Sequence, residues 1–420
     1  MRLLCLSNGH GEDEIAVRIL RELQHQQPTF EIVALPLVGE GFAYQKAQIP
    51  LIGAVKTMPS GGFIYMDGRQ LARDLKGGLV QLTRRQLQAM RNWVAAQPES
   101  LDDSLILAVG DIVPLIFAWL SRANYAFVGT AKSEYYLRDE QGWLPRPWIE
   151  DLLAKQTNCI YLPWERWLMQ RPRCKAVFPR DRLTTHFLQK KGITAFDLGN
   201  PMMDGLACTE TSATVPPAIN LTSEALAEPL TLLLLPGSRP PEAYRNWEVL
   251  LETANCLINE IGRPLVFLAA IAPAIELAPL QQALQSYRWQ QLDAHRFTVG
   301  IGERQANLIL GQNHFAEFLQ RAEVAIAMAG TATEQFIGCG KPAITIPGEG
   351  PQFTPHFAEA QARLLGPSIT PVTTPKQVPS AIRTLLQNPD QLHLIRENGQ
   401  RRMGKPGAAQ RIAHHLSTLR

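Results

Sequence analysis

The segment Val324-Ala-Ile-Ala-Met-Ala-Gly-Thr-Ala-Thr-Glu-Gln-Phe-Ile-Gly-Cys-Gly-Lys-Pro-Ala-Ile-Thr-Ile-Pro347 carries the clearest folding signal of the chain. Its first part, 324–328, is an apolar run long enough for one buried strand, and 343–346 predicts a second strand. Between them, a Gly-Thr-Ala-Thr turn leads into a helix predicted over 334–339, which the following glycine and proline end. The segment is therefore a strand–turn–helix–strand unit, which is typical of a parallel α/β sheet.

The turn in this segment has two hydroxyls and two backbone N–H groups at a helix N-terminus, where an anion or a sugar hydroxyl is favoured. The alternative is a turn of small residues chosen only for close packing. A second such turn follows the apolar strand 231–235, which brings Gly237, Ser238 and Arg239 to its carboxyl end. Glycine permits close approach of the backbone, and arginine binds phosphate oxygens in bidentate fashion. The pair of turns favours ligand binding in the second half of the chain.

The composition describes a globular protein with room for two domains. Its 420 residues are 45% hydrophobic and 19% charged, which excludes a disordered or fibrous chain. The 41 basic and 38 acidic residues leave a net charge of +3, too small to indicate nucleic acid as a partner. The six cysteines lack metal-ligand spacing and fit reduced thiols, and no Asp-x-Asp motif is present. We expect no metal and no cofactor.

From the sequence we expect no targeting or membrane-spanning segment. The first apolar run, 2–6, is too short for a signal peptide, and no segment approaches the roughly 20 apolar residues that span a bilayer. We therefore expect a cytoplasmic protein that can still touch a membrane surface.

A glycine-containing loop follows the first predicted strand, 3–6. It contains Gly9, His10 and Gly11 and precedes a helix predicted over 15–23. A strand, a Gly-x-Gly loop and a helix indicate a doubly wound domain, although the third glycine of a dinucleotide fingerprint is missing. His10 beside flexible glycines is a candidate to approach a ligand, and its other interpretation is a surface or capping histidine.

Asp111 is the acid–base candidate of the first half. It follows the buried strand 104–109, at the carboxyl end where α/β enzymes keep their chemistry. The alternative is an N-cap for the helix predicted over 115–120, a role that aspartate fills well.

The region from 61 to 91 combines an apolar loop with basic charge. Phe63 and Ile64 lie in a glycine-flanked loop, and Arg69 and Arg73 begin a basic segment with helical leucine spacing. Such a segment suits an anionic membrane surface. The alternative is an ordinary surface helix with a solvated basic face.

The composition changes between the two halves. Residues 206–230 are rich in Thr, Ser, Ala and Pro and predict an interdomain linker. We expect an N-terminal domain over 1–205, a C-terminal domain over 231–395, and a last helix over 396–420 that packs back on the N-terminal domain.

Three motifs together resemble those of lipid-A-disaccharide synthase. They are Leu-Leu-Pro-Gly-Ser-Arg (234–239), Ala-Gly-Thr-Ala-Thr (329–333) and Gly-Asn-Pro-Met-Met-Asp (199–204). The Ser-Asn-Gly-His-Gly loop (7–11) and the Gly-Asn-Pro turn are also similar to the peptidoglycan N-acetylglucosaminyltransferase and the galactolipid synthases. The resemblance extends from residue 3 to about residue 366.

This resemblance implies a GT-B fold, in which two Rossmann-like, doubly wound α/β domains face a central cleft. It implies an inverting, metal-independent transfer of an N-acetylglucosamine-type sugar from a UDP-sugar to a lipid-linked acceptor at the cytoplasmic membrane face. Asp111 or His10 would be the general base. The positions implied for the UDP-sugar are Gly237, Ser238, Arg239, Gly330, Thr331, Thr333, Glu334 and Gln335. Those implied for the acceptor are Gly9, Gly11 and Asn200.

The sequence departs from the family at the position of a ribose-binding glutamate, which is Gln335 here, beside Glu334. A neutral glutamine still donates and accepts hydrogen bonds but binds a hydroxyl more weakly than a carboxylate does. Two other functions therefore stay open. One is a UDP-sugar epimerase or hydrolase on the same fold, and the other is a non-catalytic protein that binds a glycolipid.

Overall fold

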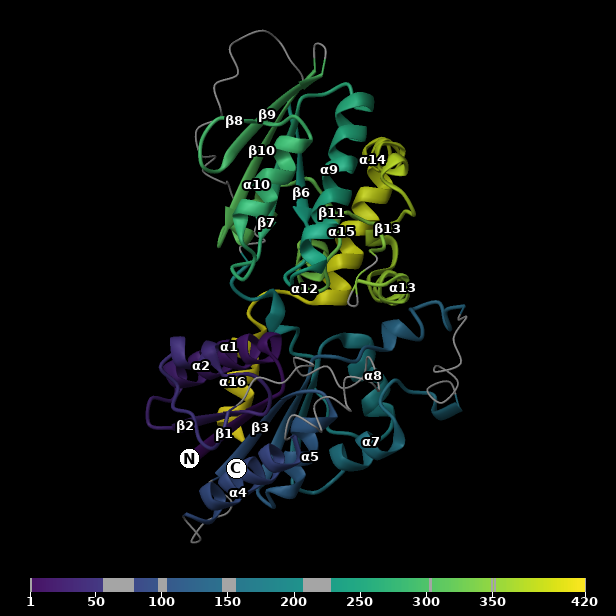
Figure 1. Cartoon of the computed structure of the whole chain (residues 1–420). Helices are drawn as coiled ribbons and strands as arrows, with labels where there is room; N and C mark the ends of the chain where they lie inside the picture. Colours follow the sequence, from purple (N-terminus) through teal and green to yellow (C-terminus); the bar gives the residue numbers. More distant parts are fainter. Residues whose placement is uncertain are drawn as a thin grey trace. The chain divides into compact units, whose positions relative to one another are not determined.

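The computed structural model describes residues 2–55, 79–96, 104–145, 156–206, 228–301, 304–348, 350 and 353–419. The chain forms two compact units (Figure 1). Unit 1 consists of Met1–Asp204 together with Gly404–Arg420, and unit 2 of Gly205–Met403. The predicted linker at 206–230 falls almost entirely outside the described residues.

Unit 1 is built on a five-stranded sheet with the order β2-β1-β3-β4-β5, in which every neighbouring pair is parallel. The sequences of these strands are almost entirely apolar, because both faces of a parallel sheet are covered by helices. Their bounds are β1 (Arg2–Ser7), β2 (Glu31–Pro36), β3 (Ser104–Gly110), β4 (Asn124–Gly129) and β5 (Cys174–Pro179).

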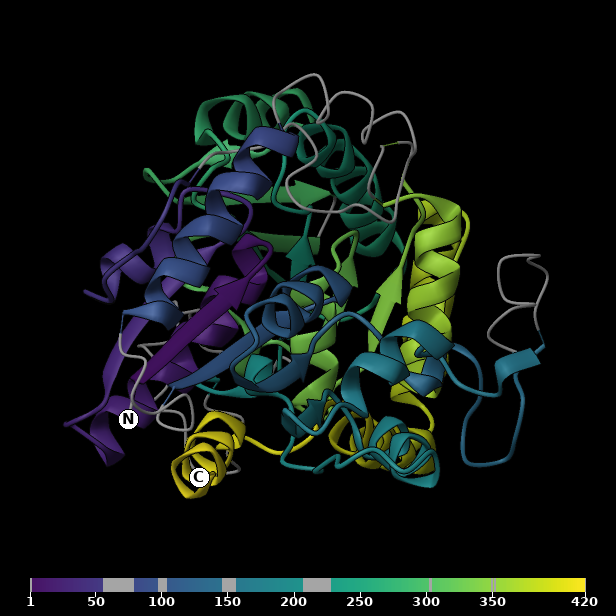
Figure 2. The ribbon, with the colours of Figure 1, turned by 90° about the horizontal axis from the view of Figure 1, so that it is seen from below.

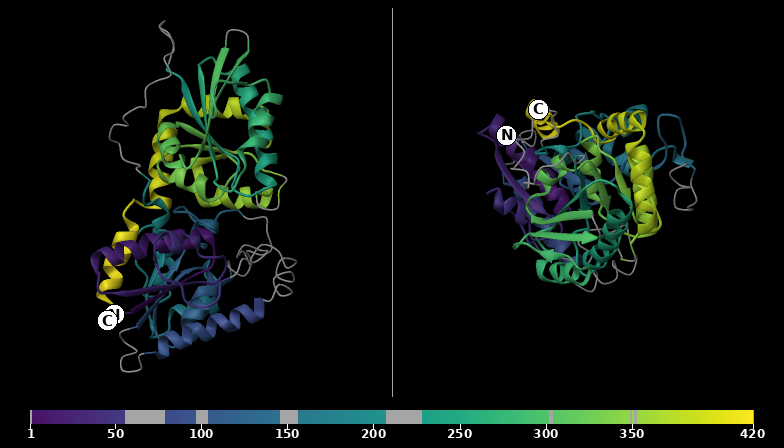
Figure 3. Two further views of the ribbon diagram at one scale, coloured as in Figure 1. Left: turned by 60° about the vertical axis from the view of Figure 1, so that its left-hand side comes forward. Right: turned by 90° about the horizontal axis from the view of Figure 1, so that it is seen from above.

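Successive residues of these strands enter two different hydrophobic clusters. Leu3 and Cys5 pack with α1 (His10–Gln26), α2 (Phe42–Lys46) and α16 (Ala408–Thr418) on one face. Leu4 and Leu6 belong to the opposite face. That face is covered by α4 (Leu79–Ala95), α5 (Ile112–Leu120), α7 (Pro163–Met169) and α8 (Arg182–Lys190). Figure 3 (left) shows purple α1 beside yellow α16, with blue α4 across the sheet. Figure 2 shows the blue helices α4 and α5 in front of the strands.

The last helix belongs to unit 1 although it follows the whole of unit 2 in the sequence. Four apolar residues of α16 enter the same cluster as α1: Ala409, Ile412, Ala413 and Leu416. The carboxylate of Asp204 accepts hydrogen bonds from the backbone N–H groups of Ala408 (3.0 Å) and Ala409 (2.6 Å). The two points where the chain crosses between the units are thus joined by the start of α16.

Unit 2 has an eight-stranded sheet with the order β13-β12-β11-β6-β7-β10-β9-β8. The strands are β6 (Leu230–Leu235), β7 (Leu265–Ile271), β8 (Gln290–Gln291), β9 (Arg296–Ile301), β10 (Arg304–Gln312), β11 (Val324–Ala327), β12 (Ala343–Thr345) and β13 (Ile369–Pro371). All pairs from β13 to β10 are parallel, whereas β9 and β8 add antiparallel strands at one edge.

The helices of unit 2 are α9 (Glu242–Glu260), α10 (Leu277–Ser286), α11 (Phe315–Arg321), α12 (Thr331–Gly338), α13 (Pro355–Leu365), α14 (Val378–Leu386) and α15 (Pro389–Met403). Residues 396–403, expected in the last helix of the chain, belong to α15. Leu232 and Leu234 of β6 lie at the centre of the main core of this unit, with Trp247 of α9 fully enclosed.

The predicted α/β class and parallel sheets are confirmed, with three corrections to the elements. The mostly apolar segment 195–198 also predicts a strand, and this prediction is wrong, because Ala195 forms only an isolated bridge with Val177. Strand β10 was not predicted, and it carries the antiparallel edge of unit 2. Helices α1 and α12 begin at His10 and Thr331, earlier than predicted, so both glycine-containing turns continue directly into helix.

Candidate active site

In unit 1 the ends of β1, β3 and β4 lie side by side, because all three strands are parallel and in close register. The backbone N–H of Thr130, just after β4, donates to the carbonyl of Gly110 at the end of β3 (3.2 Å). Asn8 follows β1 and Asp111 follows β3. This edge of the sheet therefore gathers short polar segments from three strands, as expected for doubly wound sheets.

Asp111 lies at this edge and is the N-cap of α5. Its Oδ1 accepts from the backbone N–H of Val113 (2.8 Å) and from Nδ2 of Asn8 (2.7 Å). The N-cap interpretation is therefore correct. It uses only one carboxylate oxygen, because Oδ2 accepts no hydrogen bond from the described residues.

The environment of Asp111 makes its carboxyl group less acidic than usual. Burial raises its pKa to about 6, with a further increase from the charge of Glu12, whereas the hydrogen bonds from Val113 and Asn8 act in the opposite direction. A carboxyl group with this pKa is ionised at neutral pH and is still basic enough to take up a proton.

Gly110 allows Asn8 to reach Asp111. It has a φ of +134°, and a Cβ atom built there would lie 2.0 Å from Oδ1 of Asn8. Asn8 is buried, and its Oδ1 has no hydrogen-bond partner among the described residues. Asn8 was not singled out from the sequence, although it lies only two positions before His10.

The other predicted residues of unit 1 lie at different places. His10 is exposed and is the first residue of α1, and Gly9 is its N-cap. Gly11 belongs to the first turn of α1, with open space around it. His10 and Gly11 are thus helical rather than parts of a loop, and it is Asn8 whose side chain contacts Asp111.

Asn200 belongs to the segment that leaves unit 1. Its Oδ1 accepts from the backbone N–H of Met202 (3.1 Å), and its backbone N–H lies against Gly404. The guanidinium of Arg18 on α1 donates to the carbonyls of Pro201 (2.8 Å) and Met202 (2.9 Å). These contacts hold the segment on α1 and do not bring Asn200 to Asp111.

A nearly buried ion pair beside Asp111 was also missed in the sequence. Lys132 Nζ lies 2.6 Å from Glu165 Oε2, and the same oxygen accepts from the backbone N–H of Leu162 (2.8 Å) at the start of α7. The charge of Glu165 contributes to the raised pKa of Asp111, which places this pair near the same edge. The only sign of this ion pair in the sequence is the position of Lys132 shortly after the end of β4.

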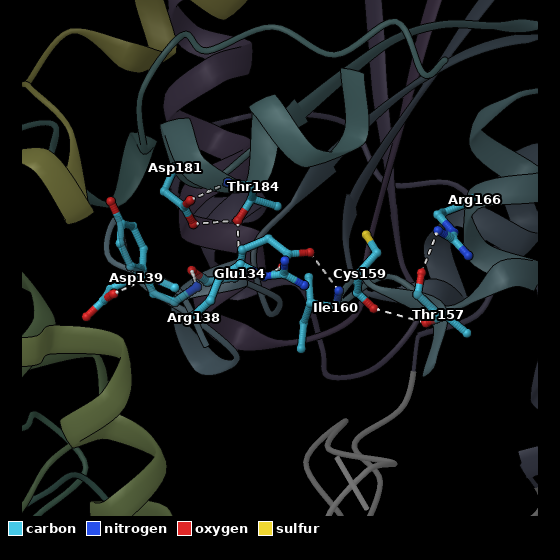
Figure 4. A network of polar contacts seen from close by, with 12 residues as sticks. Glu134, Arg138, Asp139, Thr157, Cys159, Ile160, Arg166, Asp181 and Thr184 are labelled. Atoms are coloured by element: carbon cyan, nitrogen blue, oxygen red, sulfur yellow. Dashed lines mark hydrogen bonds and ion pairs between the residues drawn. The ribbon is translucent and has the colours of Figure 1, made fainter. Parts of the chain in front are cut away.

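A second buried network stabilises the segments after β4 and β5 (Figure 4). Asp181 caps α8 by accepting from the backbone N–H (2.8 Å) and Oγ1 (2.9 Å) of Thr184. Glu134 Oε1 accepts from the backbone N–H of Ile160 (2.7 Å), and Oε2 lies 3.0 Å from Nε of Arg138. Burial raises the pKa of both carboxyl groups. The network thus links the segments that follow β4 and β5 to one another and to the start of α8.

In unit 2 the two glycine-containing turns are adjacent. Nδ2 of Asn246 donates to the carbonyls of Pro236 (2.9 Å) and Met328 (3.5 Å), which follow β6 and β11. Gly237 has a φ of +100°, and a Cβ atom built on it would lie 3.4 Å from the carbonyl of Met328. The side chains of Ser238 and Arg239 are exposed beside this point.

The second turn forms the start of α12. Gly330 is the N-cap and offers no side-chain acceptor, and Thr331 is exposed. Thr333 is buried, and its hydroxyl donates to the carbonyl of Ala329 (2.6 Å). Glu334 and Gln335 follow within the helix. The hydroxyl of Thr333 is thus engaged in the helix itself, which leaves Thr331 as the accessible hydroxyl of the pair.

Gln361 on α13 holds this turn in place and was not predicted. Its Nε2 donates to the carbonyls of Ala329 and Gly330, at 3.2 Å each. The side chain is buried, and Oε1 has no hydrogen-bond partner among the described residues.

Three further expectations concern other parts of the chain. Phe63, Ile64, Arg69 and Arg73 lie outside the described residues. Within the described ranges, no helix is long and apolar enough to cross a membrane, and no group of three metal-binding side chains occurs. The expectation of six reduced thiols is wrong for Cys339, which is disulfide-bonded, while Cys5, Cys159, Cys174 and Cys256 are free.

No protein family matches the chain by sequence, and no curated protein does. Solved structures match it over nearly its whole length. MurG of Acinetobacter baumannii has a TM-score of 0.55 and 13% identity over 99% of both chains. The UDP-GlcNAc 2-epimerase of Neisseria meningitidis, bound to UDP-GlcNAc, has a TM-score of 0.52 and 14% identity over 99% of this chain and 100% of that one.

The spinosyn rhamnosyltransferase SpnG also matches, with a TM-score of 0.52 and 13% identity over 100% of both chains. At these identities the likeness concerns the fold. Together with the two parallel α/β units, it shows that the chain has the GT-B fold. The similar structures include both glycosyltransferases and epimerases.

Proposed function

We propose that this chain is a nucleotide-sugar enzyme, and in particular an inverting, metal-independent glycosyltransferase. It moves an N-acetylglucosamine-type sugar from a UDP-sugar to a lipid-linked acceptor, as the lipid-A-disaccharide synthase does. The observation that carries the proposal is Asp111, a half-buried carboxylate with a pKa near 6 and one unengaged oxygen at the carboxyl edge of a parallel sheet.

In this reaction Oδ2 of Asp111 accepts the proton of the acceptor hydroxyl as its oxygen attacks the anomeric carbon of the donor. The bond from that carbon to the diphosphate breaks, and UDP leaves with the electron pair. Asn8 and Val113 keep the carboxylate oriented through Oδ1. His10 is the second candidate base, since it lies one residue beyond the Asn8–Gly9 loop.

The leaving diphosphate is stabilised by unit 2. The start of α12 provides backbone N–H groups and the positive end of the helix dipole, and Ser238 and Arg239 supply donors. Gly237 and Gly330 permit close approach, and Thr331, Glu334 and Gln335 line the nucleotide side. The buried Thr333 stabilises the turn through its hydrogen bond to the carbonyl of Ala329. Gly9, Gly11 and Asn200 belong to the acceptor side.

A UDP-GlcNAc 2-epimerase is the second candidate. Several of the similar structures are UDP-GlcNAc 2-epimerases, which supports this alternative at least as well as the transferase. A carboxylate with a pKa near 6 serves here too, because epimerisation also requires removal of a proton.

The two candidates differ in what they require. The protein is incubated with UDP-GlcNAc alone, and with UDP-GlcNAc and an extract of membrane lipids, while released UDP and the sugar stereochemistry are followed by NMR. We expect UDP release only with lipid. Release or epimerisation without lipid establishes the alternative, and no turnover under either condition contradicts both.

The location that fits a lipid-linked acceptor is the inner face of the membrane, with the protein bound peripherally. Phe63, Ile64, Arg69 and Arg73 are the proposed docking residues in the 61–91 region. We expect the Phe63→Ser/Ile64→Ser variant to float less efficiently with anionic liposomes, and unchanged flotation would remove these residues from the proposal.

A further inference from the structure

Helix α5 is apolar at every position and yet lies at the surface of unit 1. It runs Ile-Val-Pro-Leu-Ile-Phe-Ala-Trp-Leu over Ile112–Leu120 and contains no charged residue. Leu115 and Phe117 face the core, but Ile116 is 36% exposed, and Trp119 is only partly buried. A helix without a polar face is normally enclosed by other apolar material.

The neighbouring helix extends this apolar surface. On α7, Trp164 is 53% exposed and Trp167 is 43% exposed. The rings of Trp119 and Trp167 meet edge to face with their centres 5.5 Å apart, which joins the two helices into one surface. Large exposed tryptophans are uncommon on a free surface, so a patch of this kind marks an interaction site.

The described helices α4, α5 and α7 of this layer carry exposed positive charge and no exposed acidic residue. On α4, Arg84, Arg85 and Arg91 are exposed, and the helix contains no acidic residue. The one acidic residue of α7, Glu165, is buried and paired with Lys132. Helix α1 on the opposite face of the sheet has Glu12, Asp13, Glu14 and Glu22 against Arg18 and Arg21.

Arginines also flank the tryptophans. The guanidinium of Arg171 lies 4.2 Å from the ring centre of Trp167 and donates to the Trp167 carbonyl (3.0 Å). Arg173 donates to the carbonyl of Trp119 (3.4 Å). Tryptophan favours the boundary between lipid and water, and arginine reaches lipid phosphates from that level. The surface thus combines the side-chain types that favour the boundary between lipid and water.

We propose that the exposed surface of α4, α5 and α7 binds a bilayer that contains anionic lipids. The positive charge of this surface favours an anionic membrane over a second copy of the chain as its partner. A two-fold dimer through this surface would place two positively charged surfaces against each other. The proposal does not involve Phe63, Ile64, Arg69 or Arg73, and this membrane binding requires neither a nucleotide sugar nor turnover.

The experiment is flotation of the full-length protein with liposomes, in the absence of nucleotide sugar. One set of liposomes contains phosphatidylcholine alone, and the other contains about a third phosphatidylglycerol. We expect the protein to float only with the anionic vesicles and to be released by high salt. Replacing Arg84, Arg85 and Arg91 by Gln weakens partitioning about fivefold per arginine removed. The Trp164→Ser/Trp167→Ser variant no longer floats.

Matched controls carry the same chemical changes on the other face of the sheet. Phe42→Ser removes an exposed aromatic ring of α2, and Arg21→Gln removes an exposed charge of α1. Both should float like the parent protein. Circular dichroism of all variants shows whether the fold is kept.

A second measurement does not depend on loss of binding. Brominated lipids quench tryptophans that enter the bilayer, and we expect the Trp164→Phe/Trp167→Phe variant to float but to show much weaker quenching. The proposal is overturned if the parent protein does not float, if the tryptophan variants float and are quenched like the parent, or if the surface proves to mediate self-association on size-exclusion chromatography. Sugar transfer is measured separately, so its failure leaves this result intact.

Discussion

Asp111 holds one oxygen in structural hydrogen bonds and keeps the other available. The hydrogen bonds from Asn8 and Val113 both reach Oδ1, so the carboxylate is oriented while Oδ2 stays available. Gly110 makes this possible, because any side chain there would displace Asn8. A capping aspartate and a general base are therefore compatible roles of a single residue.

The first prediction concerns the charge of this residue. Asp111→Asn should lower kcat by about 10²–10⁴-fold with little change in stability, because asparagine caps a helix as well as aspartate does. In the unchanged protein the rate should rise as pH increases through about 6 and level off above it, since the base must be ionised. UDP release between pH 5 and 8 measures both effects.

The control for this prediction is Asp293→Asn, which changes an exposed carboxylate that also accepts from a backbone N–H, that of His295 (2.9 Å). It should leave the rate unchanged. A rate that is equally lost in both variants, or fully kept in Asp111→Asn, would show that Asp111 is not the base.

Asp13 provides a prediction on stability. It is buried in the first turn of α1, where its Oδ1 accepts from Oγ of Ser7 (2.5 Å). Burial raises its pKa to about 7, although the Ser7 hydrogen bond acts in the opposite direction. The folded state thus favours the protonated form, and its stability is highest below the unfolded pKa of about 4.

As pH rises from about 4 through 7, this group should cost about 4 kcal/mol of stability, an order-of-magnitude value. Asp13→Asn imitates the protonated acid and should remove this part of the pH dependence, so that the variant is the more stable form at pH 8. Urea unfolding at pH 5 and pH 8 tests this. An equal loss of stability in both proteins between these values would contradict it.

At the residue scale, the sequence predicted the functional residues that directly follow a strand. It did not predict the residues whose side chains hydrogen-bond to these positions. Asp111 and the Pro-Gly-Ser-Arg turn are visible because they follow apolar runs directly. Asn8 and Gln361 act through side-chain contacts with residues 103 and 32 positions away. No local pattern contains such pairings, since they arise only when the sheet brings distant loops together.

At the scale of elements, α13 keeps α12 at its place. The amide of Gln361 links the two helices at the carbonyls of Ala329 and Gly330, next to the proposed diphosphate site. The position of the α12 N-terminus is therefore set by a helix that does not itself contribute donors there.

The third prediction is that Gln361→Met raises KM for the UDP-sugar several-fold while kcat changes little. Methionine fills similar volume but cannot donate, so two hydrogen bonds worth about 1 kcal/mol each are lost. Steady-state kinetics separates the two constants. Gln281→Met, which removes an exposed hydrogen bond to the Ala294 carbonyl, is the control. A fall in kcat at constant KM would contradict the positioning role.

The elements themselves were largely predictable, and the exceptions have physical causes. Strong apolar runs such as 104–109 and 231–235 became strands because both faces of their sheets are covered. Residues 195–198 carry the same kind of signal but find a partner at one position only. Strand β10 begins with two exposed residues, then alternates between buried and partly buried ones, and it pairs with β9, which no local apolar run indicates.

At the scale of the whole molecule, the two units have separate cores. The apolar residues of β6 and α9 form one cluster within unit 2, whereas those of β1 divide between the two clusters of unit 1. Each unit can therefore unfold cooperatively and independently of the other.

The fourth prediction follows from this division. Calorimetry should resolve two transitions, and UDP at about 100 times its Kd should stabilise one of them by about 2.7 kcal/mol. Hydrogen exchange should assign that transition to unit 2, with the strongest protection around α12. Protection confined to unit 1 would place the nucleotide in the wrong half and overturn the assignment of the donor site.

The pairing of α16 with α1 has a consequence for biosynthesis. Because α16 is made after the whole of unit 2, α1 leaves the ribosome long before its partner exists, and the apolar surface formed by residues such as Ile15 and Leu20 stays uncovered. Unit 2 is continuous in the chain and can fold during translation, whereas unit 1 is completed only after residue 404. The nascent chain therefore passes through a state that requires protection from aggregation, and a polypeptide that stops after α15 would remain in it.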